Sequence, residues 1–235
     1  MNATDPNLSP AIWMHRASAF ELLALAFLVP TDALAEAYAS GEYAEACAEA
    51  FETALPADER VGHAVELLVQ PAAPEGATAS DVLSLLRREH TRLFIGEREP
   101  LITPFAGVWA TQRQGGRGLL FVGEESVAIE RAMKRCGITK NLGAGQTNDP
   151  LDHIGTLCEF LMYLCLIQAK AIQAPEGARV EKDDFGQFME QHFAPFAFWL
   201  AKETERQTRL PFFQGAALLL AVAADLAPTT RKTAE

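Results

Sequence analysis

The chain has 235 residues, 49% of them hydrophobic and 22% charged, a balance typical of a globular protein that excludes wholesale disorder. Its 20 basic and 31 acidic side chains give a formal net charge of −11. This charge argues against nucleic acid or an anionic membrane surface as a partner and mildly favours a cationic one, although acidity often serves solubility alone.

Helical periodicity, capping residues and proline breaks predict about ten helices and no strand. The first helix opens at Ser9-Pro10, where a serine cap precedes a proline at the first helical position. The expected helices cover residues 10–29, 32–39, 42–55, 57–69, 80–94, 124–135, 150–174, 181–193, 195–208 and 211–226. Residues 1–8 and 228–235 are expected to be loose tails. The prediction is an all-α protein, one helical bundle domain over residues 1–235 with one long Pro/Gly-rich loop.

That loop is expected over residues 95–122, which hold two prolines and five glycines. Three aromatic residues, Phe105, Trp109 and Phe121, lie among them. A loop of this length inside a compact domain is uncommon and is often functional. Since aromatic residues on loops are frequent in binding, Trp109 is the best contact candidate of the three.

The most unusual helix is expected to begin near residue 149. Asp149 can serve as its N-cap, Pro150 suits its first position, and Asp152 then lies in the first turn. From Ile154 onward the sequence is apolar nearly all round, which predicts a buried central helix. One polar stripe interrupts it at helical spacing, formed by Asp152, Thr156, Glu159, Tyr163 and Lys170, with His153 beside its start.

The sequence offers little for catalysis or metal binding. It has no HExxH, no Glu-x-x-His and no phosphate-binding loop, and its five histidines lack metal-ligand spacing. Asp152 and His153 are adjacent, and adjacent helical residues do not face each other, so they do not form a ready acid–base pair. A first-turn acid followed by a histidine near the cap is an equally good structural reading. We therefore expect no enzyme, no catalytic residue and no metal site.

The cysteines and apolar segments bear on the compartment. Four cysteines form neither a CxxC pair nor a zinc pattern, and Cys158 and Cys165 lie seven residues apart in the apolar helix, where reduced thiols behave as small hydrophobes. Reduced thiols fit a reducing compartment. No signal-peptide pattern opens the chain, and the apolar run 215–224 is too short to cross a bilayer. We expect a cytoplasmic protein without stable membrane insertion.

Two separated stretches carry a resemblance to a known family. The first is Glu89-His90-Thr91-Arg92-Leu93-Phe94-Ile95-Gly96, followed by Pro100, Pro104-Phe105 and Trp109. The second is Asp149-Pro150-Leu151-Asp152-His153-Ile154, followed by Glu159-Phe160-Leu161. Together they resemble the E-Y-x-R-L-F-x-G, P-Y-x-S-x-Y and E-P-x-D-H-I motifs of the TorD/DmsD family, cytoplasmic chaperones for molybdenum-cofactor oxidoreductases exported by the twin-arginine route. Departures from the motifs are His90 for Tyr, Asp149 for Glu, Phe105 for Tyr, Ala106-Gly107 for Glu-Ser and Trp109 for Tyr.

The resemblance implies a binding site for the client's leader peptide. The residues that match the motifs are Pro150, Asp152, His153, Glu159, Arg92, Phe94, Pro104, Phe105 and Trp109. A twin-arginine leader offers two guanidinium groups and an apolar segment, so its reader needs carboxylates and an apolar groove. Some of these residues also have a purely structural interpretation. Phe94 is more often core than contact, Arg92 can pair with Glu89 at a helix end, and Glu159 can instead accept from Arg92.

The first functional hypothesis is a system-specific chaperone that binds the twin-arginine leader or the apo form of a molybdopterin-dependent oxidoreductase, aids cofactor insertion and delays export. A related alternative is a nitrate-reductase-type maturation chaperone that holds a non-exported client. Two others are a nucleotide-binding enzyme, since the resembling family has been linked to GTP, and a structural subunit of a redox complex. The chain is expected to need no cofactor, to bind no nucleic acid and to be a monomer or homodimer.

Overall fold

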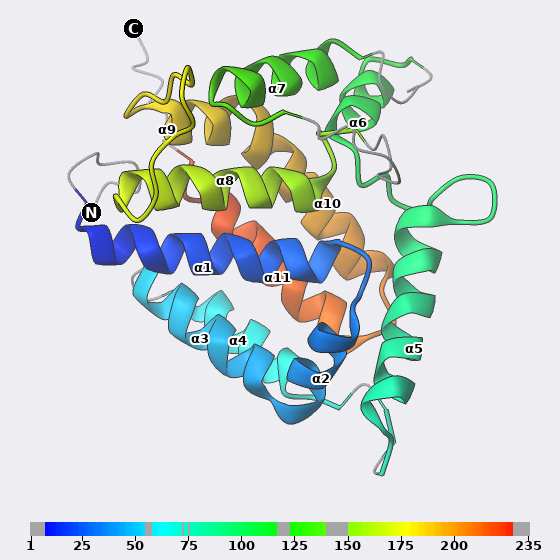
Figure 1. The fold of residues 1–235 in the computed structure, drawn as a ribbon. Helices are drawn as coiled ribbons and strands as arrows, with labels where there is room; N and C mark the ends of the chain where they lie inside the picture. Colours follow the sequence, from blue (N-terminus) through cyan, green and yellow to red (C-terminus); the bar gives the residue numbers. More distant parts are fainter. Residues whose placement is uncertain are drawn as a thin grey trace, which may run out of the picture.

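The computed structural model describes residues 8–54, 58–71, 73–74, 76–116, 123–139 and 150–227. Its helices, shown in Figure 1, are α1 Pro10–Phe27, α2 Asp32–Ser40, α3 Glu42–Ala54, α4 Glu59–Leu68, α5 Ala79–His90, α6 Ala106–Arg113, α7 Glu124–Arg135, α8 Ile154–Gln168, α9 Asp184–Phe188, α10 Ala194–Gln207 and α11 Pro211–Ala224. Two π-helical turns, η1 Thr91–Ile95 and η2 Met189–Phe193, continue α5 and α9. Among the described residues, the only β pairing is an isolated bridge between Phe105 and His153.

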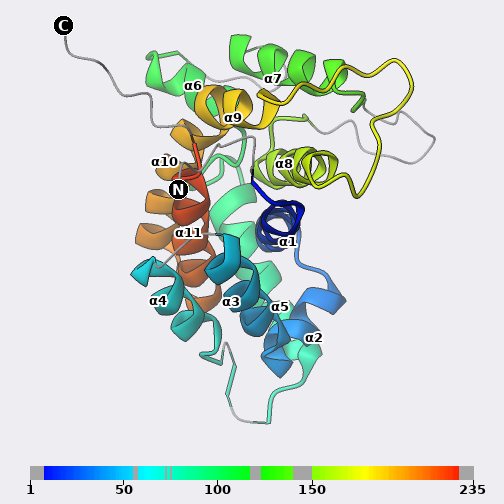
Figure 2. The ribbon, with the colours of Figure 1, turned by 90° about the vertical axis from the view of Figure 1, so that its left-hand side faces the viewer.

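The core is built on three apolar helices. α1 packs along α8, and the two run antiparallel, as Figure 1 shows. Behind them α11 packs against α10, α4 and α1, and most of its side chains are buried. α3 joins α1 to α4 from below, and α6 and α7 lie at the opposite end of the molecule. Figure 2 shows α1 and α8 end-on at one edge of the molecule.

Local sequence signals explain several helix starts. The Ser9 side chain accepts a hydrogen bond from the Ile12 N–H and so caps α1, as expected. Thr78 and Asp81 form a reciprocal capping box at α5. The all-α prediction is confirmed. Among the described residues, no single helix is long and apolar enough to cross a membrane. Taken together, α1 and α2 are long and apolar enough, but the chain bends by 112° between them.

Two boundaries differ from the expectation. Residues 106–113 of the expected loop form α6. The central helix begins at Ile154 and ends at Gln168, so Pro150 and Asp152 precede it. The expected cap Asp149, the expected tail 228–235 and all of the expected tail 1–8 except residue 8 lie outside the described residues. The formation of α6 and the late start of α8 have one cause, a contact between distant segments that single-segment patterns do not contain.

Candidate functional site

The two sequence motifs meet at the start of α8. The Ala106 N–H donates to the Asp152 carbonyl at 3.0 Å, and the Ile154 N–H donates to the Pro104 carbonyl at 2.9 Å. These bonds flank the bridge between Phe105 and His153. Pro104 is buried, and so is Pro150 just before the junction. A short antiparallel pairing therefore joins residues 104–106 to residues 152–154, and we call it the motif junction.

Asp152 is the polar centre of the motif junction, and its side chain is only 2% exposed. Its Oδ2 accepts from the Gly107 N–H at 2.8 Å and from the Ser126 hydroxyl at 2.6 Å. Phe105, the N-cap of α6, offers no capping group, so Asp152 supplies the cap from a different segment. Asp152 thus binds α6 and α7 to the start of α8. The expectation that it acts as a first-turn acid of its own helix is wrong.

The second carboxylate oxygen of Asp152 has a different status. Oδ1 is buried and accepts no hydrogen bond from any residue that the structure describes. Buried carboxylate oxygens without a donor are costly, so an atom in this position is a candidate acceptor for a ligand.

Gly107 and Ser126 occupy adjoining space beside this carboxylate. A Cβ atom on Gly107 would lie 1.9 Å from the Ser126 Oγ and 2.8 Å from the Asp152 Oδ2. The Ser126 hydroxyl therefore fills the volume that a side chain at position 107 would need. Gly107 departs from the family motif, and nothing in the sequence indicates that a hydroxyl arrives from α7. The absence of a side chain at Gly107 was the one available signal of close approach.

His153 caps α8, a role that the sequence assigned to Asp149. Its Nδ1 accepts from the Gly155 N–H at 3.1 Å. The ring meets Phe105 edge-on, with centroids 5.2 Å apart. Both side chains are partly exposed, so they form the accessible part of the motif junction.

Glu159 lies on the exposed side of α8, six residues or about one and two-thirds turns after His153. Partial burial among apolar neighbours raises the pKa of its carboxyl. No cation in the described ranges lies within ion-pair distance of it, and Arg92 pairs with Glu89 instead. The alternative in which Glu159 accepts from Arg92 is therefore wrong.

Trp109 is buried in α6, with 6% of its surface exposed, so its expected place in an open loop is wrong. Its ring packs against Phe196 and Trp199 of α10 with centroids 5.4 and 6.3 Å away. The Arg113 guanidinium covers it at 5.0 Å. Trp109 therefore fixes α6 onto α10.

Arg92 and Phe94 lie in the framework of the fold. Arg92 makes a double hydrogen bond to Glu89 at 2.8 and 2.7 Å and also donates to the Gln207 carbonyl. Phe94 is 4% exposed and contacts Phe27 edge-on. The structural readings of both residues are confirmed. Leu93, which lies between them, accepts a hydrogen bond from the Ile102 N–H at 2.9 Å, and this bond anchors the segment that leads into the motif junction.

Polar contacts hold α7 in place, and nothing in the sequence predicts them. Near its start, the Glu125 Oε1 lies within hydrogen-bond distance of the His192 Nδ1 of η2, at 2.8 Å. At its end Arg135 binds the buried Asp184 of α9 through two hydrogen bonds of 3.0 and 2.6 Å. Ser126 adds the bond to Asp152. These ties form between helices far apart in the chain, and no spacing rule relates their members.

The described residues contain no group of three or more metal-ligating side chains that could hold an ion. A family model described as "Nitrate reductase delta subunit" matches residues 54–201, which is more than half of the chain. A search of the curated proteins finds no match.

Proposed function

Because this chain belongs to the nitrate reductase delta subunit family, a family of molybdoenzyme maturation chaperones, we propose that it binds the twin-arginine leader of a molybdopterin-dependent oxidoreductase in the cytoplasm. It would hold the apo client while the cofactor is inserted and so delay export. This role needs binding and release, and it assigns no catalytic step to the chain.

One observation carries the proposal, namely the meeting of the two motifs at the motif junction. Residues 104–106 and 152–154 are far apart in the chain and share no local element, yet their backbones pair. The junction presents the half-buried His153 and Phe105, with the exposed carboxylate of Glu159 on the same helix start. An aromatic surface beside a carboxylate suits a guanidinium group followed by an apolar segment.

The nine motif residues then divide into two roles. Glu159, His153 and Phe105 would contact the leader, because they are at least partly exposed. The other six are buried or held in internal bonds and would keep the site in shape: Asp152, Pro150, Pro104, Trp109, Arg92 and Phe94. Asp152 would join the contacts if its free Oδ1 becomes accessible to a donor of the leader.

The test is calorimetry of the full chain with a twin-arginine leader peptide. Glu159→Gln should weaken binding about two- to five-fold, the range of an exposed ion pair worth up to about 1 kcal/mol. Phe105→Ala should weaken it further through lost apolar contact. Glu130→Gln, an exposed acid on α7, is the matched control and should bind like the parent. Unchanged binding of both site variants would refute this assignment.

The family description favours a second candidate, a nitrate-reductase-type client without an exported leader. The chaperone would then hold another segment or the folded body of its client. Capture of an apo client whose leader has been deleted separates the two readings. Undiminished capture supports the second candidate, whereas loss of capture supports leader recognition.

The GTP-binding alternative has no support from a motif in the sequence, and we propose that the chain works without a cofactor. A GTP titration that releases no heat and yields no hydrolysis would agree with this, and saturable binding would contradict it.

A further inference from the structure

The outer side of the α1–α8 pair is a second surface near the motif junction. The two helices pack closely at one end, where a Cβ on Gly155 would lie 2.6 Å from the Leu28 Cγ. Since the helices are antiparallel, the end of α1 adjoins the start of α8 and therefore the motif junction (Figure 1). Figure 2 looks along both helices and shows them at one edge of the molecule.

This surface is apolar along most of its length. On α1, Met14, Leu25 and Val29 beyond its end are 42%, 40% and 59% exposed. On α8, Met162 and Leu166 are half-buried and lie at helical spacing from Glu159. We call this set the α1–α8 face. Apolar side chains gathered on one side of a helix pair mark an interaction surface more often than isolated ones do.

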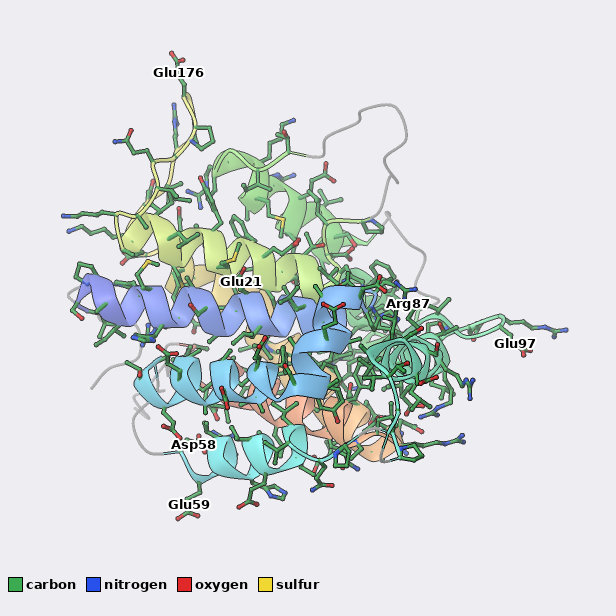
Figure 3. The ribbon with its side chains drawn as sticks, turned by 60° about the horizontal axis from the view of Figure 1, so that its bottom comes forward. Glu21, Asp58, Glu59, Arg87, Glu97 and Glu176 are labelled. Atoms are coloured by element: carbon green, nitrogen blue, oxygen red, sulfur yellow. The ribbon has the colours of Figure 1, made fainter. Side chains whose placement is uncertain are left out.

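Two carboxylates interrupt the α1–α8 face, Glu159 on α8 and Glu21 on α1. Figure 3 shows Glu21 on α1 with α8 running alongside. Within the described ranges, neither carboxylate has an ion-pair partner. Glu21 lies seven residues before Leu28, and Glu159 lies four residues after Gly155. Because the helices are antiparallel, both lie in the same direction from the Leu28–Gly155 contact, and at 1.5 Å per residue they are offset along the helix axes by about 4–5 Å. Neighbouring helix axes are about 8–10 Å apart, so the backbone positions that bear the two carboxylates are about 10 Å apart.

We propose that the α1–α8 face receives an apolar client segment that carries two cationic side chains, with Glu21 and Leu25 as contact residues. The charge and apolarity of the face together select this partner. An all-apolar segment would leave both carboxylates unpaired, and a polar cation would leave the apolar residues exposed to water. The exposed glutamates of α3, among them Glu45 and Glu49, lack this apolar setting, so solubility accounts for them.

This inference rests on the proposed function, since the twin-arginine leader supplies both features of the segment. It extends the binding surface from the motif junction along α1. The experiment is calorimetry of the full chain with a leader peptide that contains the Arg-Arg pair and the following apolar segment. Glu21→Gln should weaken binding about two- to five-fold and reduce its salt dependence. Leu25→Ser should weaken binding by a similar factor.

Matched controls are available on other faces. Glu49→Gln removes an exposed acid from α3, and Val69→Ser removes a 60% exposed apolar side chain beyond α4. Both should bind like the parent. A coupling test adds specificity, because Glu21→Gln should cost less affinity with a peptide in which one arginine is replaced by glutamine.

The outcomes separate the two proposals. If Glu159→Gln and Phe105→Ala weaken binding while Glu21→Gln and Leu25→Ser do not, the motif junction reads the leader and the α1–α8 face is excluded. If the parent binds no leader peptide, leader recognition fails and the named occupant fails with it. If Leu25→Ser converts a dimer to a monomer in sedimentation without changing peptide affinity, the face binds a second copy, which also overturns the proposal.

Discussion

Gly107 and Ser126 show how one buried carboxylate depends on two positions in different helices. Gly107→Ala would place a Cβ 1.9 Å from the Ser126 hydroxyl. The hydroxyl would have to turn away and leave Asp152 with one hydrogen bond fewer. We expect a loss of about 1–3 kcal/mol in the free energy of unfolding, measured by urea denaturation.

The double variant Gly107→Ser/Ser126→Ala is the control for this prediction. It moves the hydroxyl from α7 to α6 while keeping the volume nearly constant. It should recover part of the stability lost in Gly107→Ala. If the double variant is no more stable than the sum of the single losses, the two positions do not share one hydroxyl site.

Glu159 predicts a pH effect on binding. Its pKa is raised by partial burial, so its carboxyl takes up a proton at a higher pH than the ordinary value of 4.5. Only the ionised form attracts a guanidinium group, which itself stays charged at these pH values. Affinity for the Arg-Arg peptide should therefore fall as the pH drops from 7.5 toward 5. Glu159→Gln should flatten this part of the profile, and an unchanged slope in that variant would exclude Glu159 from contact.

Single-residue predictions from the sequence were right where burial decides and wrong where a side chain reaches another element. Apolar character and short-range pairing suffice to place Phe94 in the core and Arg92 on Glu89. Trp109 is buried because α10 supplies aromatic partners, and no local pattern contains that information. The role of Asp152 depends in the same way on α6 and α7.

Between helices, Glu89 is a polar link with four hydrogen bonds. It accepts from Arg92 and also from the Thr208 hydroxyl and the Arg209 N–H, at 3.1 and 2.6 Å, which ties α5 to the turn before α11. Burial by itself would raise the pKa of Glu89, but these hydrogen bonds outweigh it and leave the pKa below its ordinary value. The stabilisation is therefore complete above pH about 4.5 and is lost as the pH falls through the lower pKa of the folded protein.

Glu89→Gln should remove this link while keeping the side-chain shape. We expect a loss of about 1.5–3 kcal/mol at pH 7, the range of hydrogen bonds to a charged group, and a smaller difference from the parent near pH 3. Urea denaturation at the two pH values measures both. A difference that stays constant with pH would contradict the assignment of the stabilisation to the ionised carboxylate.

The Arg135–Asp184 pair makes a prediction about α7. Asp184 is buried, and among the described residues Arg135→Ala would leave its carboxylate with only the Glu181 N–H and the weak Cys136 thiol as donors. We expect a loss of about 1–3 kcal/mol, less than for a fully buried pair because the Arg135 side chain is 39% exposed. Hydrogen exchange should accelerate first in α7. Arg131→Ala, an exposed arginine on the same helix, should change neither measurement.

Helix type and number were predictable from periodicity and caps, because those signals are local. The Pro/Gly content of residues 95–122 hid α6, whose N-terminus is capped by Asp152 instead of by a neighbour in sequence. The start of α8 was placed too early for a related reason. The backbone of residues 152–154 pairs with residues 104–106, and residue 152 is thereby held out of the helix.

For the molecule as a whole, charge is unevenly distributed along the chain. Residues 8–69 hold ten acidic and two basic side chains, a net of −8 out of the total of −11. This segment forms α1 to α4, so one side of the molecule carries most of the net negative charge. A field of this sign should draw a cationic segment toward α1 and weaken with added salt.

The most direct test of leader recognition is calorimetry with an Arg-Arg leader peptide and its Lys-Lys counterpart, each at low and high salt. We expect micromolar binding of the Arg-Arg peptide that weakens with salt. Binding should be several-fold weaker for Lys-Lys, because lysine cannot make the two-pronged contact with a carboxylate that arginine makes. Equal affinity for the two peptides, or binding of neither, would contradict a chaperone that reads the twin-arginine leader.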